Sequence, residues 1–346
     1  MTDQKAVTAD EAVESASSSE LARYRKLPWY ATAWLIIAAI VSMLASIYVI
    51  FGLGNQLGTY VPVENGYFYF MIAALLPLPF MIYPSGAITG SPFQRLTTVM
   101  APGLALAVPA MLCFELAFPT LAESIGVIGH IILLAVLVAI FSVPYLLRGS
   151  DVDGIPLFDL LLALVAFGVS GYFAWSGNEI LEIGWEYDAP QHAKYLAFVL
   201  WALILEATRR AGGTAIFYVC LVVSIYPMLS HYAPGFLHGA PVSPEVTVGF
   251  HMFGTESVLG IPMNAFANLV VGFLIFGVAL QYSGGGAFFL NLAFALLGKR
   301  RGGPAKVAIF SSGLMGSMSG SVITNVLTTG VMTIPAMKRV GFRPSY

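Results

Sequence analysis

Charged residues are scarce in this chain. Only 10% of its 346 residues are Asp, Glu, Lys or Arg, whereas 58% are hydrophobic. Soluble domains carry roughly 25% charged residues, so the composition argues against a soluble enzyme or binding domain. The ~10-residue alternating segments of a transmembrane barrel are also missing. With a mean hydropathy of +0.82, the chain has the composition of a polytopic helical membrane protein.

Basic surface, cysteine pairs and enzyme motifs are missing as well. The net charge of −2 leaves no positive excess for binding nucleic acid. Cys113 and Cys220 lie in apolar segments without metal-ligand spacing. The five histidines show no such spacing either, and no GxSxG or HExxH motif occurs. We therefore expect neither an enzyme nor a cofactor. Residues 1–22, acidic and rich in Ala and Ser, are predicted to form a disordered cytoplasmic tail.

Apolar runs of about 20 residues can cross a bilayer. About eight such transmembrane helices are predicted, at residues 31–53, 67–88, 100–121, 125–147, 155–175, 195–205 with weaker extensions, 214–231 and 261–280. The expected fold class is therefore all-α.

The distribution of charge orients these spans. Arg23, Arg25 and Lys26 precede the first span, which places the N-terminus in the cytoplasm by the positive-inside rule. If successive spans alternate in direction, the later cytoplasmic loops contain arginines, and the charged residues of the opposite loops are almost all Glu and Asp. Lys194 is the one basic exception.

The end of the chain follows a different pattern. Residues 287–297 are apolar but too short to cross, and basic residues follow them, so we expect an interfacial helix on the cytoplasmic side. Residues 305–340 also have basic flanks that parity places in the cytoplasm. The segment is therefore predicted to enter and leave by the same face, as a re-entrant helical hairpin.

The middle of this hairpin is unusually polar for its depth. Residues 316–335 read GSMSGSVITNVLTTGVMTIP, and the candidate ion- and solute-binding residues of the tip are Ser319, Gly320, Ser321, Asn325, Thr328 and Thr329. Freed carbonyls and Ser, Thr or Asn oxygens suit a sodium ion, for which Ser319, Ser321 and Asn325 are the candidate ligands. Gly320 allows the turn, and Ser312 and Gly316 allow close packing of the first arm. The alternative is that these hydroxyls bond only to the preceding helical turn.

Polar residues inside other spans have structural and functional interpretations. Glu115 and His130 are expected to pair between scaffold helices rather than to serve transport. Asn264 and Asn268 share one helical face, where hydrogen bonding between helices is favoured over solute contact.

Charges near span ends have local interpretations. Asp159 is expected to pair with nearby Arg148, and Glu206 with Arg209 and Arg210 is expected to anchor a cytoplasmic helix end.

Several segments resemble a known family. Residues 302–342, GGPAKVAIFSSGLMGSMSGSVITNVLTTGVMTIPAMKRVGF, resemble the first hairpin of the large membrane subunit of tripartite ATP-independent periplasmic (TRAP) transporters. EATRRAGG (206–213), TESVLGIP (255–262) and FLIFGVALQYSGGGAFF (273–289) extend the resemblance, which covers about residues 150–346. The family's tip reads closer to SGSSVANV. The departures here, at Val322, Ile323 and Thr324, leave open which ion or solute the tip accepts.

The resemblance implies a multi-pass permease of a bacterial inner membrane. It implies sodium symport of a C4-dicarboxylate or other carboxylated solute, delivered by a periplasmic TAXI-type receptor and moved by an elevator mechanism. It also implies fused subunits: residues 23–150 would form a four-helix small-subunit-like region and residues 151–346 the first half of the large subunit. The expectation is an incomplete permease, which could be a split gene, a truncated frame or a fragment; a separate chain carrying the second half is one partner that this expectation allows. The alternative is a non-transporting membrane scaffold or docking protein.

Overall fold

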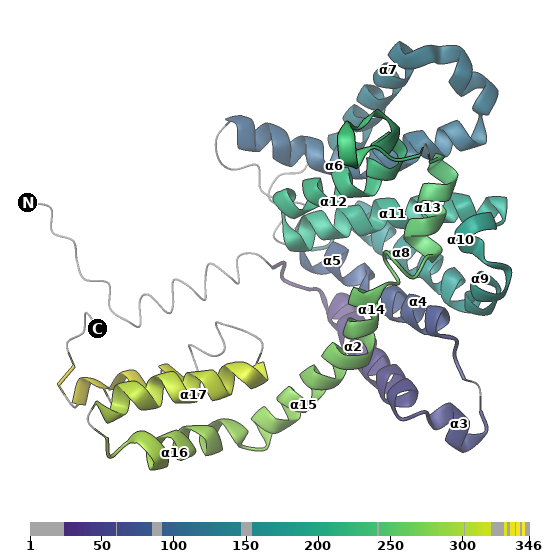
Figure 1. Ribbon diagram of the computed structural model, residues 1–346. Coiled ribbons are helices and arrows are strands. Elements are labelled where there is room, and N and C mark those ends of the chain that lie inside the picture. Colours follow the sequence, from purple (N-terminus) through teal and green to yellow (C-terminus); the bar gives the residue numbers. More distant parts are fainter. Residues whose placement is uncertain are drawn as a thin grey trace, which may run out of the picture. The chain divides into compact units, whose positions relative to one another are not determined.

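The computed structural model describes residues 24–59, 61–84, 92–146, 154–240, 242–300, 302–319, 329–330, 333–335, 337–339 and 341–342. Helices and their connections make up this part of the chain, and no strand occurs in it (Figure 1). Within the described residues, seven helical segments are long and apolar enough to cross a membrane: Trp29–Ile50, Glu64–Ile82, Met100–Ala117, Ser124–Val143, Leu157–Trp175, Thr214–Tyr232 and Ile261–Leu280. The prediction of an all-α polytopic membrane protein is therefore confirmed.

The chain forms two compact units. The described residues up to Ala267 form one unit, and the described residues from Asn268 onward form the other. The expected boundary after residue 150 is not a boundary of packing, because helices on both of its sides pack within the first unit. The division at residue 150 stays a prediction, namely that the two regions correspond to a small and a large transporter subunit.

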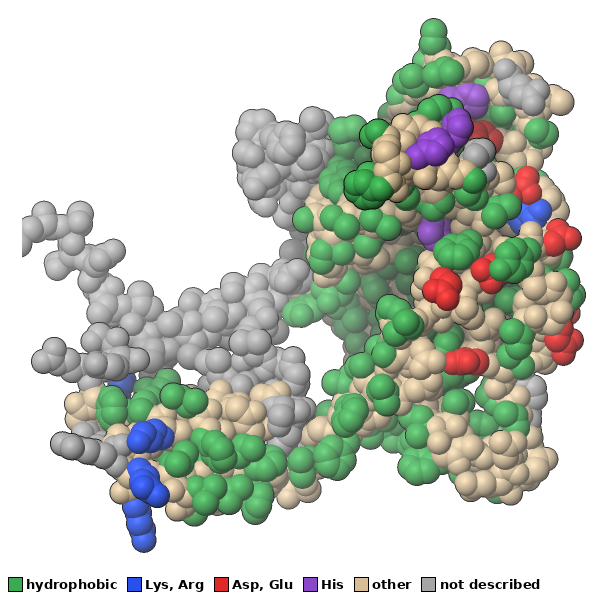
Figure 2. Space-filling model, viewed as in Figure 1, with side chains coloured by type: hydrophobic (Ala, Val, Ile, Leu, Met, Phe, Trp, Pro, Cys, Tyr) green, Lys and Arg blue, Asp and Glu red, His purple; other side chains and the backbone are tan. Residues whose placement is uncertain are grey.

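The larger unit is a bundle of long helices with short helices at their ends. Its elements are α2 (Trp29–Ile50), α3 (Leu53–Leu57), α4 (Glu64–Leu75), α5 (Pro77–Ile82), α6 (Pro92–Ala117), α7 (Pro119–Leu146), α8 (Leu157–Trp175), α9 (Gly177–Ile183), α10 (Trp185–Asp188), α11 (Gln191–Gly212), α12 (Thr214–Leu229), α13 (Pro244–Phe253) and α14 (Ile261–Ala265). On the face shown in Figure 2, hydrophobic side chains are spread widely, and acidic ones gather on the side of α9 and α10.

Proline and glycine shape two of the spans. Pro77 separates α4 from α5 within one predicted span, because its ring and missing N–H interrupt a helical ladder. In α7, Gly126 has φ 61° and ψ −177°, and the helix is kinked there. Positive φ costs glycine little, since it has no Cβ. Both interruptions therefore fall at a residue that the sequence makes visible.

Helix α11 lies at the centre of the bundle, where it packs against α5, α6, α8, α12 and α13. It has 22 residues, and it includes the predicted sixth span, yet it is not among the seven segments that pass on length and composition. Its last turns carry Glu206, Arg209 and Arg210, all buried. Because protein covers these charges, α11 does not need the high mean hydropathy of a lipid-facing helix.

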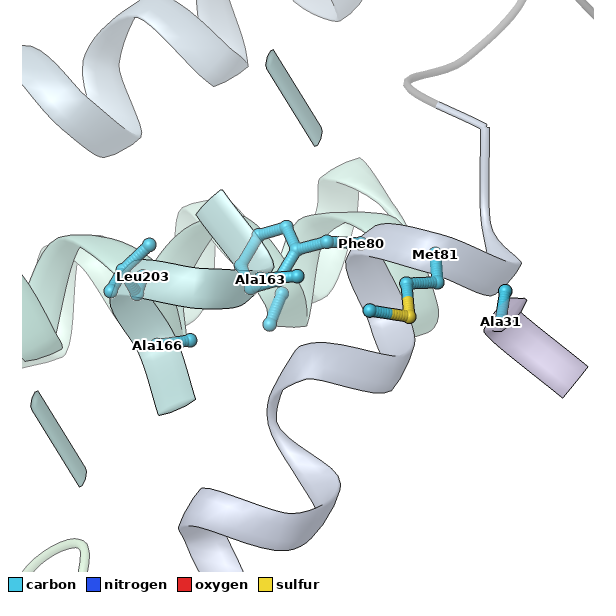
Figure 3. Packing of buried hydrophobic residues seen from close by; sticks show 7 residues of the cluster. Ala31, Phe80, Met81, Ala163, Ala166 and Leu203 are labelled. Carbon is cyan, nitrogen blue, oxygen red and sulfur yellow. The ribbon is translucent and has the colours of Figure 1, made fainter. Parts of the chain in front are cut away.

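A small apolar core joins the beginning of α2 to α5, α8 and α11. Its buried members are Ala31, Phe80, Met81, Ala163, Ala166, Leu203 and Ala207 (Figure 3). Four of the seven are alanines, which let helix backbones approach closely. Close approach at this end brings together the polar groups described below.

The smaller unit contains α15 (Val271–Tyr282), α16 (Gly285–Leu297) and α17 (Gly303–Ser319), which pack on one another. Helix α16 has 13 residues, about 20 Å in length, which is too short for a hydrocarbon core of ~30 Å. Its position at a membrane interface stays a prediction. The turn into α17 is tight: Gly302 has φ +72°, and a Cβ on Gly303 would lie 2.3 Å from the carbonyl oxygen of Gly298.

Candidate functional site

The structure describes helices on both sides of the predicted hairpin tip. Helix α17 supplies a first arm that ends at Ser319, and described residues from Thr329 to Arg339 are again helical. Gly320, Ser321, Asn325 and Thr328 lie outside the described residues. The tip and its proposed sodium ligands therefore stay a prediction.

Thr329 is the tip residue whose surroundings the structure describes. Its side chain is buried, and its carbonyl oxygen accepts a hydrogen bond of 2.8 Å from the Thr333 hydroxyl. This is the local back-bonding of a helical threonine, the alternative considered for the polar cluster. For Thr333 that interpretation holds, and Thr329 lies in a helical turn rather than in an unwound one.

The buried face of the first arm differs from the small-residue stripe noted in the sequence. Val307, Ser311 and Met315 are buried, at spacings of four residues. Ser312 and Gly316 come one position later, and Gly316 is exposed. Because one residue turns a helix by about 100°, the two stripes face different directions.

The segment 261–280 also contains an interruption of regular α-helix. Between α14 and α15, Phe266–Val270 form a π-helical turn, a feature frequent at functional sites. The carbonyl oxygen of Ala267 accepts hydrogen bonds from the Tyr67 hydroxyl at 2.9 Å and the Ser46 hydroxyl at 3.4 Å. These bonds satisfy the carbonyl in a bilayer, where water would not reach it.

Asn264 belongs to the same interruption. Its Nδ2 donates to Glu64 Oε1 at 2.6 Å, which links α14 to the first turn of α4. The predicted interhelical hydrogen bond of Asn264 is therefore confirmed. The expected pairing of Glu115 and His130 is confirmed too, with 3.5 Å between Oε1 and Nε2 across α6 and α7.

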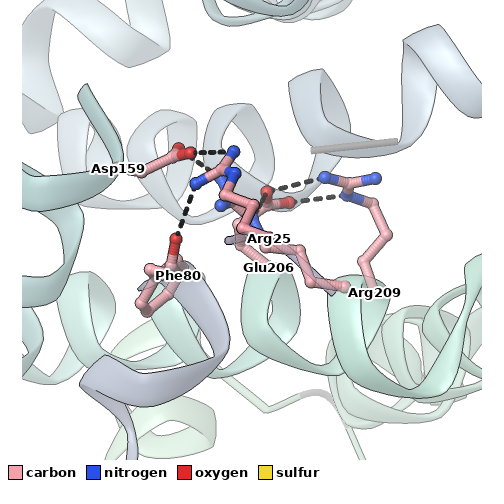
Figure 4. Close-up of polar contacts among 6 residues, drawn as sticks. Arg25, Phe80, Asp159, Glu206 and Arg209 are labelled. Carbon is pink, nitrogen blue, oxygen red and sulfur yellow. Dashed lines mark hydrogen bonds and ion pairs between the residues drawn. The ribbon is translucent and has the colours of Figure 1, made fainter. Parts of the chain in front are cut away.

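A buried cluster of five charged side chains lies beside the apolar core (Figure 4). We call it the ionic cluster; its members are Arg25, Asp159, Glu206, Arg209 and Arg210, all buried. They come from the segment before α2, the first turn of α8 and the last turns of α11.

Asp159 is the point at which these three segments meet. One carboxylate oxygen accepts from Arg25 Nη2 at 2.7 Å, and the other accepts from Arg210 Nη2 at 2.9 Å. Asp159 was expected to pair with Arg148, which lies outside the described residues. The partners that the structure describes, Arg25 and Arg210, are much more distant from Asp159 in the sequence. Arg25 also donates to the carbonyl oxygen of Phe80 at 3.3 Å.

Glu206 completes the ionic cluster. Arg209 binds it through two nitrogens, at 2.7 and 2.8 Å, and Arg210 Nε donates to it at 2.7 Å. The guanidinium of Arg210 also lies 5.1 Å from the centroid of the Phe80 ring. Planar guanidinium groups suit such bidentate hydrogen bonding and stacking on aromatic rings. Buried ion pairs of this kind hold helices in register, because removal of one partner leaves the other charge buried and uncompensated.

His251 on α13 forms a third polar contact that the sequence did not indicate. Its Nε2 lies 2.8 Å from the carbonyl oxygen of Ser224, and its Nδ1 lies 3.0 Å from the Ser257 hydroxyl. The first contact requires a proton on Nε2, so neutral His251 accepts from Ser257. Burial lowers the pKa of His251, and the hydrogen bond to the Ser224 carbonyl opposes this in part.

The described part of the chain contains no group of three or more His, Cys, Asp or Glu side chains placed to hold a metal ion. The ionic cluster was missed because each charge was interpreted within its own loop. A usable signal existed: span parity places Arg25, Asp159, Glu206 and Arg210 at the same membrane side, with opposite signs.

Comparison with known proteins gives two findings. A family model described as "Tripartite ATP-independent periplasmic transporter, DctM component" matches residues 199–346. The chain is also similar to a "Putative TRAP transporter large permease protein" of Haemophilus influenzae (strain ATCC 51907 / DSM 11121 / KW20 / Rd). The two are 31% identical over 80 residues, which are 23% of this chain and 19% of that protein. The matched part is thus about a fifth of the relative's length. No solved structure matches the chain.

Proposed function

We propose, from the match of residues 199–346 to the model of the DctM component of TRAP transporters, that the chain is a membrane permease component of a sodium-coupled TRAP-type transporter. The match to residues 199–346 carries this proposal, because it contains α12, the interrupted segment 261–280 and the predicted hairpin. We further propose an inner-membrane location with the N-terminus in the cytoplasm, supported by the charge distribution between spans.

The proposed cargo is a carboxylated solute delivered by a periplasmic receptor of the TAXI type. The support is chemical: an oxygen-rich, glycine-containing tip suits sodium, and a second arm that begins near Asn325, as the sequence predicts, would add a helix N-terminus that favours an anionic group. An elevator movement of the hairpin belongs to the same proposal. The two-unit division, with the hairpin in the smaller unit, is compatible with such a movement.

Sodium binding to the purified protein tests the proposal without knowledge of the solute. Binding of radioactive sodium is measured in detergent for the parent chain, Asn325→Ala and Asn55→Ala. Asn55 is an exposed asparagine in α3, outside the family match, so its variant is the matched control. We expect Asn325→Ala to lose sodium binding while Asn55→Ala retains it, because only Asn325 is a proposed oxygen ligand.

Uptake into proteoliposomes gives the second measurement. The protein, together with any separate chain that supplies further hairpins, is tested with a receptor and a sodium gradient. Gly320→Val should abolish uptake by blocking the turn. If Asn325→Ala leaves both sodium binding and uptake unchanged, the polar side chains of the tip serve packing rather than ion binding. Receptor binding without any sodium binding would instead favour the docking protein.

A further inference from the structure

A large apolar groove lies between α2, α4 and α8 in the larger unit. Its volume is about 1070 Å³, at the upper end of the range for ligand sites, roughly 300–1,000 Å³. Much of its wall consists of small side chains, namely Ala38, Ala45, Ala73, Ala74, Gly171 and Ala174. Small residues usually let membrane helices touch. Here they line a hollow instead.

The groove lies at membrane depth, because α2, α4 with α5, and α8 form three of the seven candidate spans. It is an open groove rather than a sealed cavity, since side chains of its wall such as Ile37, Phe70 and Phe167 remain exposed. Protein interiors hold few voids of this size, because empty space forfeits dispersion contacts. Hydrocarbon from the bilayer is the available filling.

One end of the groove is polar. Tyr48, Trp175 and Asn178 line it there, where α2 and α8 finish and α4 begins. The three helix ends are held together by the hydrogen bond of Ser46 with Tyr67 at 3.0 Å and by the close approach of Gly66 to Gly177. Tyr and Trp at a helix end mark the headgroup level of a membrane. Apolar walls with one polar end match an amphiphile.

Acidic residues accompany the lining residues of this end in the sequence. Glu64 and Glu179 flank lining residues in the sequence, and Glu182 follows one turn later in α9. The chain has no Lys or Arg from residue 27 to 94, or from 154 to 193. An ammonium group is therefore attracted to this end, whereas a purely anionic headgroup is repelled.

We propose that this groove holds an acyl chain of a membrane phospholipid whose headgroup carries an ammonium group at the Trp175 end. The proposal stands independently of transport, since every residue that carries it lies outside the family match. A bound chain would fill the space beside α2, of which only 17% is buried by protein.

Two glycines of α8 provide a matched pair of variants. Gly171 lines the groove and Gly168 does not. A Cβ added at either position meets no atom within 4 Å. Leucine favours a helix more than glycine does, so both Gly171→Leu and Gly168→Leu should fold. Only Gly171→Leu places a side chain in the groove. Equal unfolding temperatures verify that both variants are intact.

The experiment measures retention of lipid by native mass spectrometry. Protein is exchanged from vesicles of phosphatidylethanolamine or phosphatidylglycerol, with identical acyl chains, into detergent. We expect one phosphatidylethanolamine to stay on the parent and on Gly168→Leu, and about tenfold less on Gly171→Leu, which corresponds to a modest overpacking cost. Phosphatidylethanolamine with a photoreactive group in its acyl chain should label peptides of α2, α4 or α8.

Three outcomes would overturn the proposal. Equal retention by the two leucine variants would show that lipid binds elsewhere. Retention of detergent alone would make the occupant an adventitious additive only. Preferential retention of phosphatidylglycerol would contradict the ammonium headgroup. Labelling that is lost in Gly171→Leu but kept in Gly168→Leu, and competed by unlabelled phosphatidylethanolamine, would establish the site.

Discussion

Removal of the Asp159 carboxylate is the most informative perturbation of the larger unit. Asp159 is fully buried and accepts charge-assisted hydrogen bonds from Arg25 and Arg210, at 2.7 and 2.9 Å. In Asp159→Ala, both guanidinium groups stay buried with one acceptor fewer. Breaking a buried pair in this way costs about 3–5 kcal/mol. For a unit of this size, we expect the unfolding temperature to fall by roughly 6–20 °C.

Arg25→Ala should be milder than Asp159→Ala. Asp159 keeps Arg210 in that variant, so the main loss is one hydrogen bond to a charged group, about 1.5–3 kcal/mol, together with the 3.3 Å hydrogen bond to the Phe80 carbonyl oxygen. The double variant should be less destabilised than the sum of the two by about 0.5–3 kcal/mol, since the same contact is removed twice. Unfolding of all three is followed by intrinsic fluorescence in lipid nanodiscs.

A partly exposed ion pair supplies the control. Lys194 Nζ lies 2.9 Å from Glu245 Oε2, with the Glu245 side chain 40% exposed. Pairs in such positions contribute about 0–1 kcal/mol. Glu245→Ala should therefore change the unfolding temperature little. The reasoning fails if Asp159→Ala unfolds at the same temperature as Glu245→Ala, because the ionic cluster would then contribute nothing beyond a surface pair.

Two further predictions concern contacts of α13 and α14. Asn264→Asp should lower the unfolding temperature more than Asn264→Ala, because it faces a carboxylate towards Glu64; Glu64→Gln should rescue Asn264→Asp, and equal effects of both single variants would contradict the contact. Burial lowers the pKa of His251, so the unfolded chain takes up a proton near pH 6.5 before the folded one does. Stability present above that pH should fall on acidification, and pH titration of unfolding should show a smaller fall in His251→Gln; parallel curves for the two proteins would rule His251 out as the cause.

Sequence patterns predicted the helices of this protein well, because lipid exposure imposes a strong constraint on composition. Segments such as Leu157–Trp175 and Ile261–Leu280 match predicted spans within two residues. The interruption at Pro77 and the kink at Gly126 depend on the properties of single residues. By contrast, the π-helical turn at Phe266–Val270 has no local sequence signal, since the carbonyl of Ala267 is satisfied by Tyr67, 200 residues earlier.

The ionic cluster could not be assembled from the sequence for a related reason. Arg25 and Asp159 are 134 residues apart, and nothing local distinguishes their attraction from that of other charges. The pairing of Glu115 with His130 was easier, because adjacent antiparallel helices bring nearby residues together. The proposed sodium ligands depend on the hairpin tip, and that part of the interpretation remains a prediction from sequence.

The ionic cluster also bears on the direction of the central helix. Asp159 lies in the first turn of α8, whereas Glu206 and Arg210 lie in the last turns of α11. Their contacts require α11 to return to the end at which α8 begins. The backbone N–H of Arg25, just before α2, donates to the carbonyl of Ile82 at the end of α5, and so joins the same end. This is the arrangement that alternating spans predict when α11 is counted as a span. Hydropathy omits α11 because its charges are satisfied inside the protein, and those same charges show that it traverses the bundle.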